Sequence, residues 1–194
     1  QHSMYAAHLV GPTGAVHAFE PIPHICRQLE DSAESNQYED IVHAHTVALG
    51  TQNSQETFHI SDDAGGSSLV NREDDGHDIV LEVRHGDEEL AAITSIDMIK
   101  IDVEGYEYEV LKGIRATLEK HTPVIIIEYS GDFYSKHTDK HGEKILDLLI
   151  SLGYDLYDIE NDMRKIKDTE FFVEEIAQRR KQTNLLCLQK RHEI

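Results

Sequence analysis

Apolar, β-branched runs alternate along this chain with stretches of helical periodicity, and this alternation most limits the folds open to it. The clearest run is residues 124–129 (VIIIEY), whose nearly continuous apolar character is typical of a parallel strand covered on both faces. Strands that alternate with helices of about 10 to 15 residues indicate βαβ units. The sequence therefore predicts an α/β fold with a mostly parallel sheet.

The predicted elements are separated by short connections. Between residues 51 and 95 two alternating segments, 56–60 and 79–83, predict a hairpin-like insertion carried on the sheet rather than a second domain. Residues 160–181 are charged and helix-prone, and we expect them to be solvated. We expect residues 1–194 to form a single domain. Strands are predicted at residues 15–19, 41–49, 96–103, 124–129, 154–159 and 184–189, and helices at 23–34, 106–119 and 142–152.

Charge and cysteine content exclude several classes of protein. The 194 residues include 18 Lys and Arg but 37 Asp and Glu, giving a net charge of −19. Such an acidic chain is a poor partner for nucleic acid or for an anionic membrane surface, and it lacks an apolar run near the roughly 20 residues of a membrane helix. Its two cysteines, Cys26 and Cys187, are too few for a disulfide scaffold, so we expect reduced thiols and a cytoplasmic location.

Acidic residues stand where the predicted strands end. Glu20, Asp102 and Glu104 follow strand segments, and Glu128 lies near the end of another. Because ligands of open parallel sheets bind beyond the carboxyl ends of the strands, we expect these four residues at one rim.

Glu20 has two interpretations. A carboxylate at the end of the second strand of a nucleotide-binding βαβ unit accepts hydrogen bonds from both ribose hydroxyls, about 20 residues after a glycine-rich turn. That spacing leads back to the start of the sequence. Alternatively, Glu20 is a carboxylate at a helix N-terminus, favoured by the helix dipole.

The stretch Asp102-Val103-Glu104-Gly105 also has two interpretations. Two carboxylates on a strand-to-helix turn can bind a cationic group, orient a substrate hydroxyl or ligate a metal. The alternative is a helix start with acidic residues at its positive end.

Other motifs carry weaker signals. The run Gly65-Gly66-Ser67-Ser68 either offers N–H groups and hydroxyls to a ligand or is a loop tip. Residues 71–82 imitate a calcium loop but lack its apolar eighth position, and we assign no residue to a metal. The paired histidines 43/45 and 137/141 are interpreted as surface residues. The sequence contains neither a G-x-S-x-G elbow nor a Walker-type phosphate loop.

Several stretches together resemble the FkbM-type family of S-adenosylmethionine-dependent methyltransferases, from about residue 3 to residue 190. The combination is specific, although each piece alone is weak. The matching stretches are Leu9-Val10-Gly11-Pro12-Thr13-Gly14, Val16-His17-Ala18-Phe19-Glu20-Pro21, Val47-Ala48-Leu49-Gly50, Gly65-Gly66-Ser67-Ser68-Leu69, Ile99-Lys100-Ile101-Asp102-Val103-Glu104-Gly105, the helix 107–118, residues 123–128 and Asn184-Leu185-Leu186.

The resemblance implies a Rossmann-like class I methyltransferase fold whose last strand is antiparallel, and O-methylation of a hydroxyl on a sugar or secondary metabolite. By the same resemblance, Glu20 holds the ribose of S-adenosylmethionine, and Val47 and Ala48 line the adenine pocket. Asp102 lies beside the methionine part as a positioning group, and Ser67, with its loop, faces the cofactor or the substrate.

An alcohol acceptor must lose its proton as the new bond forms. Asp102, Glu104, Glu128 and His85 are the candidate bases, and we favour Glu104. The expected partner is a small-molecule or glycan hydroxyl, and a homo-oligomer stays open.

The family's first strand and its Asp-x-Gly-x-Asn-x-Gly turn would stand immediately before Gln1, and the sequence does not contain them. We expect that they precede Gln1 in a longer protein. Two other functions stay open: a methyltransferase-like module that binds a partner protein without chemistry, and a metal-binding protein built on the acidic loop.

Overall fold

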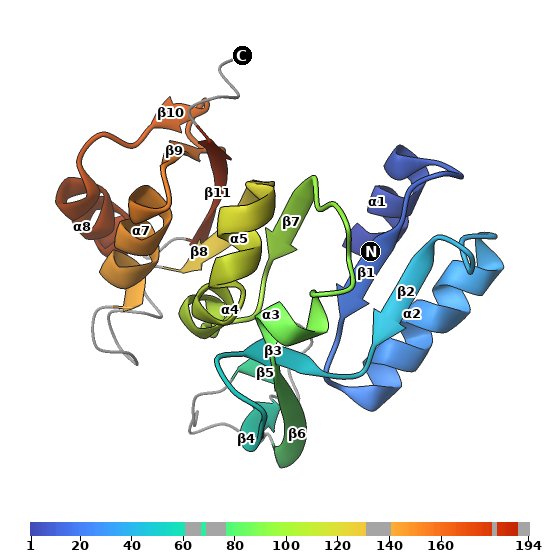
Figure 1. Cartoon of the computed structure of the whole chain (residues 1–194). Helices are drawn as coiled ribbons and strands as arrows, with labels where there is room; N and C mark the ends of the chain where they lie inside the picture. Colours follow the sequence, from blue (N-terminus) through green and yellow to red (C-terminus); the bar gives the residue numbers. More distant parts are fainter. Residues whose placement is uncertain (61–66, 69–76, 131–140, 180–181, 190–194) are drawn as a thin grey trace.

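The strands in the described part of the chain form three sheets (Figure 1). The computed structural model describes residues 1–60, 67–68, 77–130, 141–179 and 182–189. One sheet consists of β1 (Val16–Phe19) and β2 (Val42–His45). The largest has the order β10 (Arg164–Lys165), β9 (Tyr154–Asp158), β11 (Gln182–Gln189), β8 (Val124–Ser130), β7 (Met98–Ile101). The third has the order β3 (Ala48–Gly50), β6 (His77–His85), β4 (Ser54–Ile60), β5 (Ser67–Ser68).

The prediction of one mostly parallel sheet is wrong for the described strands. Only β1–β2, β3–β6 and β7–β8 pair in parallel, and the remaining described pairs are antiparallel. One cause is the insertion. Its strands β4 and β6 form the predicted hairpin, and β3 pairs with β6 and β5 with β4, so that these four strands form a separate sheet. The other is that no backbone pairing within the described residues joins β1 to β7, although both strands run in the same direction (Figure 1).

The antiparallel last strand is confirmed. β11 lies between β8 and β9 and pairs with both in antiparallel orientation. Its alternate residues Thr183, Leu185 and Cys187 are buried, which matches the strand's position inside the sheet.

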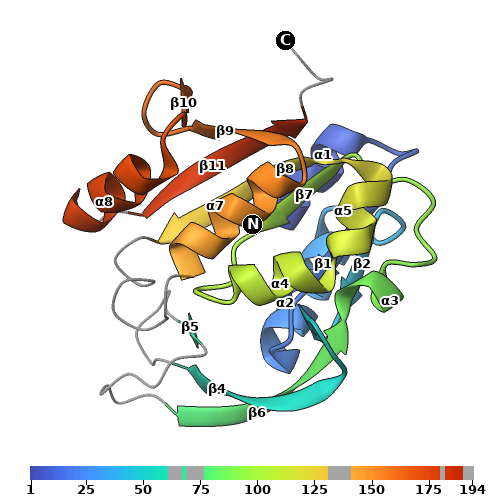
Figure 2. The same ribbon diagram turned by 60° about the vertical axis from the view of Figure 1, so that its left-hand side comes forward.

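The main core lies on one face of the largest sheet. Ile125, Ile127 and Tyr129 of β8 are fully buried there, as the alternation of a strand requires. Figure 2 shows α4 (Glu107–Gly113), α5 (Arg115–His121) and α7 (His141–Ser151) in front of β7 and β8. Leu111 and Leu146 of these helices belong to the same buried cluster. The opposite face of β8, which carries Glu128, is only half-buried.

Two further helices cover the β1–β2 pair. Ala7 of α1 (His2–Val10), Ala33 of α2 (Pro23–Ser35) and Val42 of β2 form a second small core. Helix α1 is not among the predicted elements. Its exposed Tyr5 and Leu9 give it apolar residues on more than one side, so the sequence shows no amphipathic pattern there.

The predicted strand at 41–49 is two strands. The chain bends at residues 46 and 47, so that β2 pairs with β1 whereas β3 pairs with β6. The residues on both sides of the bend have high strand propensity, so the pattern alone does not indicate where one strand ends.

The predicted helix at 106–119 is interrupted at Ile114. Two contacts explain the break. The Asp87 carboxylate, from α3 (Gly86–Glu89), accepts hydrogen bonds from the backbone N–H groups of Ala116 (3.0 Å) and Thr117 (2.7 Å), and so caps α5. Gly113 lies against β3, where a Cβ atom would be 2.0 Å from the Gly50 carbonyl oxygen. The periodicity of the sequence indicates neither a helix cap supplied by another element nor a close contact between backbones.

The prediction that residues 160–181 are solvated is wrong for part of that segment. Phe172 and Ile176 of α8 (Thr169–Arg179) are 2% and 3% exposed and belong to the main core. None of the helices in the described ranges combines the length and the apolar character that crossing a membrane requires.

Candidate active site

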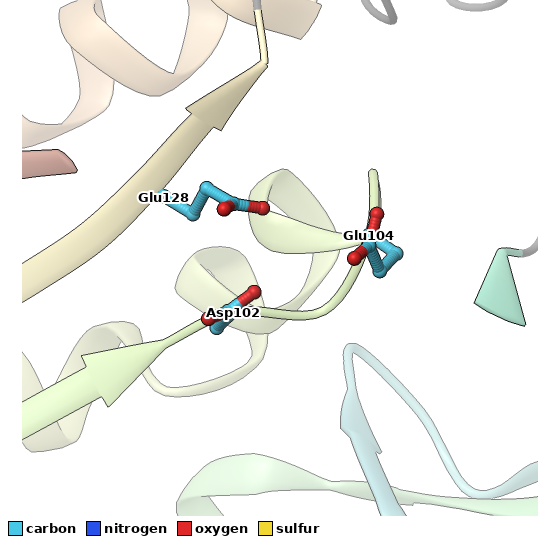
Figure 3. A group of neighbouring side chains, drawn as sticks. All are labelled: Asp102, Glu104 and Glu128. Atoms are coloured by element: carbon cyan, nitrogen blue, oxygen red, sulfur yellow. The ribbon is translucent and has the colours of Figure 1, made fainter. Parts of the chain in front are cut away.

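Three carboxylates converge at the carboxyl ends of β7 and β8 (Figure 3). The parallel register ends at the pair Ile101–Ile127, and the next residues are Asp102 and Glu128. Glu104 follows on the turn after β7. One oxygen from each of the three carboxylates lies within 4.8 Å of the others. The shared rim predicted from the strand ends is thus confirmed for these three residues, which we call the carboxylate cluster.

The turn that carries Glu104 is fixed by a fourth acidic residue. Glu107, 1% exposed in the first turn of α4, accepts hydrogen bonds from the backbone N–H groups of Val103 (3.4 Å) and Gly105 (3.1 Å). Glu104 and Gly105 have φ angles of 50° and 104°, so two consecutive residues are left-handed. Glu107 therefore supports the turn at the helix start, whereas Asp102 and Glu104 lie in the cluster.

A lysine neutralises part of the charge. The Lys100 ammonium lies 3.4 Å from an Asp102 carboxylate oxygen and donates a hydrogen bond to the Asn184 side-chain carbonyl at 2.9 Å. Asn184 is the cross-strand partner of Glu128 and donates to the Glu160 carboxylate at 2.8 Å. Polar contacts thus extend from the cluster across β11 through Lys100 and Asn184, two supporting residues that no local sequence pattern indicates.

Burial and the neighbouring carboxylates change the protonation of Glu128. Burial, followed by the charges of Asp102 and Glu104, raises the pKa of Glu128 from an ordinary 4.5 to about 7, and Lys100 opposes the shift. Near neutral pH Glu128 therefore holds a proton for part of the time, and the cluster carries fewer than three negative charges.

This shift predicts a pH-dependent stability. Between pH 4.5 and about 7 the folded protein holds more protons at Glu128 than the unfolded chain does, so the parent loses stability as the pH rises through this range. Glu128→Gln removes the loss. The difference in melting temperature, variant minus parent, should grow by about 2–4 °C between pH 5 and pH 8 in thermal unfolding followed by circular dichroism. Glu34→Gln, at an exposed site on α2, is the control, and a difference that does not change with pH contradicts the shift.

Glu20 lies at the end of β1. Its carboxylate oxygen Oε1 accepts a hydrogen bond from the backbone N–H of Ile22 at 3.0 Å, next to the start of α2. Burial raises the pKa of Glu20, and the Ile22 hydrogen bond and His24 oppose that shift. The hydrogen bond from Ile22 thus agrees with the helix-terminal interpretation of Glu20, but it occupies only the Oε1 oxygen. Among the described residues none donates a hydrogen bond to Oε2, so the second oxygen leaves the ribose interpretation open.

The other predicted cofactor residues lie close to Glu20 or outside the described side chains. The backbone N–H of Glu20 donates to the His45 carbonyl at 3.0 Å, and Val47 and Ala48 follow two and three residues later, 7% and 9% exposed. Ser67 starts β5, but its side chain lies outside the described part, as do Gly65 and Gly66. Residues 71–76, the first half of the calcium-loop segment 71–82, lie outside it as well, as does the histidine at 137.

Tyr106 ties the insertion to the turn of the site. Its hydroxyl donates to the Glu56 carboxylate of β4, 3.2 Å from one oxygen and 3.3 Å from the other. Its ring lies edge-on to Phe58, and burial raises the pKa of its hydroxyl. His85, the fourth candidate base, ends β6 opposite Gly50, and no contact in the described region places it in the carboxylate cluster.

The chemistry of the cluster favours a cationic ligand. Its oxygen donors suit a hard divalent cation or an organic cation, and Lys100 offsets only part of the charge. An ionised carboxylate at this rim can also accept a proton from a hydroxyl.

Comparison with known proteins identifies similar sequences and folds. A model of the methyltransferase FkbM domain matches residues 1–156. The crystal structure of methyltransferase FkbM from Methylobacillus flagellatus KT superposes with a TM-score of 0.53 at 17% sequence identity, over 95% of this chain. This chain spans 40% of the length of that protein. No curated protein sequence matches.

Proposed function

The chain belongs to the methyltransferase FkbM domain family, and on this premise we propose that it is an S-adenosylmethionine-dependent O-methyltransferase acting on a hydroxyl of a sugar or secondary metabolite. The observation that carries the proposal is the carboxylate cluster at the ends of β7 and β8. The strand order β7-β8-β11-β9, with β11 antiparallel, supports the Rossmann-like class I fold.

Two features of the described residues fit the proposed cofactor. The cluster's excess negative charge suits the positively charged methionine part, with Asp102 as the positioning group. The Oε2 oxygen of Glu20 has the acceptor chemistry that a ribose hydroxyl requires, and Val47 and Ala48 supply apolar surface nearby. When bound, S-adenosylmethionine supplies an electrophilic methyl group. We also propose that Ser67, at the start of β5, faces the cofactor or the substrate.

The three carboxylates have different roles in this proposal. Glu104 accepts the proton of the acceptor hydroxyl, and Asp102, paired with Lys100, positions the cofactor. Glu128, whose pKa is raised to about 7, holds a proton for part of the time near neutral pH and so reduces its own repulsion with the other two carboxylates. The turn fixed by Glu107 keeps Glu104 at the rim, which supplies alignment.

Glu20→Gln is expected to weaken cofactor binding by roughly tenfold to a hundredfold, because a hydrogen bond to a charged group contributes about 1.5–3 kcal/mol. The measurement is calorimetric titration of the full chain with S-adenosylmethionine and with S-adenosylhomocysteine. Glu30→Gln, an exposed carboxylate on α2, is the matched control.

The outcomes separate the two functions. Binding that is weakened by Glu20→Gln but not by Glu30→Gln supports the methyltransferase and the ribose assignment together. Equal affinity in both variants removes Glu20 from the site. No binding by the full-length natural protein, including any residues before Gln1, favours the module that binds a partner protein without chemistry.

A further inference from the structure

Three histidines that are not members of the carboxylate cluster share one face of the β1–β2 pair. The parallel register places His17 opposite His43, and Phe19 opposite His45. Because side chains alternate along a strand, these four residues lie on the face opposite to Val42, which packs into the small core under α1 and α2. His17 and His43 are exposed and His45 is half-buried. We call His17, His43 and His45 the histidine cluster.

The rings of the histidine cluster are close and partly fixed. Nδ1 of His17 and Nε2 of His45 lie 3.2 Å apart. The two rings stack with centroids 5.5 Å apart, and the His43 ring lies 5.0 Å from that of His17. His45 also stacks on Phe19 at 4.6 Å, with an interplanar angle of 12°. One of the two nearest nitrogens is therefore held in place by a neighbouring ring.

We propose that His17 and His45 bind a divalent transition metal of the zinc class, with His43 as a third ligand after rotation of its side chain. Zinc binds imidazole nitrogen at about 2.0–2.1 Å, so two nitrogens 3.2 Å apart subtend an angle of about 100° at the metal, close to tetrahedral. Water completes the coordination, because His17 and His43 are exposed. Imidazole donors favour zinc, nickel and copper, whereas the oxygen donors of the carboxylate cluster favour magnesium and calcium.

The chemistry of imidazole suits this role, because a neutral ring keeps a lone pair on one nitrogen for a metal. Without metal, one ring donates its N–H to the other; on binding, that proton moves through water to the outer nitrogen of the same ring, so each ring stays neutral.

The test is calorimetric titration of the full chain with zinc chloride at pH 7.5. We expect one site that His17→Gln and His45→Gln each weaken by roughly tenfold or more. His121→Gln, at the end of α5 and outside the cluster, is the matched control and should bind zinc as the parent does.

A spectroscopic readout keeps the test independent of stability. Cobalt bound to the parent should give visible absorption typical of a tetrahedral site with nitrogen ligands, and His17→Gln should abolish it at an unchanged melting temperature. His43→Gln should alter the spectrum without removing it. Equal zinc affinity in the parent and both cluster variants, or equal losses in His121→Gln, would overturn the proposal. Failure of S-adenosylmethionine to bind would leave it unaffected.

Discussion

Replacing Gly113 with alanine is expected to lower the melting temperature by roughly 6–12 °C. The added Cβ atom would lie 2.0 Å from the Gly50 carbonyl oxygen and 2.5 Å from its carbon, and both are backbone atoms that no side-chain rotation can move. Overpacking costs about 1–3 kcal/mol and more against a rigid neighbour, and each kcal/mol shifts the melting temperature of a chain of this size by about 2–4 °C. The usual helix preference for alanine, about 1 kcal/mol, offsets only part of this.

Thermal unfolding of the purified variant measures the effect. Lys112→Ala, one residue earlier on the same helix and half-exposed, is the control and should change the melting temperature by no more than about 2 °C. An alanine variant as stable as the parent would mean that α4 is not seated on β3 at Gly113. Because α4 begins just after the turn that carries Glu104, the same clash should also weaken cofactor binding.

Glu104→Gln is expected to lower kcat for methyl transfer by roughly 10²–10⁴-fold, the usual contribution of a general base. Glutamine keeps the size of the side chain but cannot accept the hydroxyl proton. Cofactor affinity should change little, because the positioning role is assigned to Asp102. The assay is release of S-adenosylhomocysteine with an acceptor found by screening monosaccharides and hydroxylated small molecules.

The split between kcat and cofactor affinity makes this result specific. Asp102→Asn should mainly weaken binding of S-adenosylmethionine, and Glu119→Gln, exposed on α5, should alter neither quantity. A Glu104→Gln variant with kcat within about twofold of the parent contradicts the assignment of the base. The proton acceptor would then be Asp102 or Glu128.

The carboxylate cluster could be predicted from the sequence because the prediction requires only the positions where two strands end. Parallel strands end at one edge of a sheet, so Asp102 and Glu128 can be placed together once their strands are identified. The supporting residues depend on register. Lys100 reaches Asn184, 84 positions away in the chain, only because β11 lies beside β8. Local patterns carry no such information.

The same distinction explains the errors in the fold. The bend after His45 and the break at Ile114 both occur where another part of the chain makes a contact: β6 pairs with β3, and Asp87 caps α5. The residues on both sides of each position favour the same secondary structure, so tertiary contacts rather than propensity decide where one element ends and the next begins.

The left-handed backbone at Glu104 implies a trade-off between stability and activity at this position. A non-glycine residue in a sparsely populated backbone region costs of order 1–3 kcal/mol, and glycine or asparagine would adopt this φ of 50° more readily. Position 104 is therefore where a search for thermostabilising substitutions would begin. Glycine and asparagine both relieve the strain there but remove the carboxylate, so in the proposed methyltransferase a more stable protein obtained with either residue would transfer the methyl group more slowly.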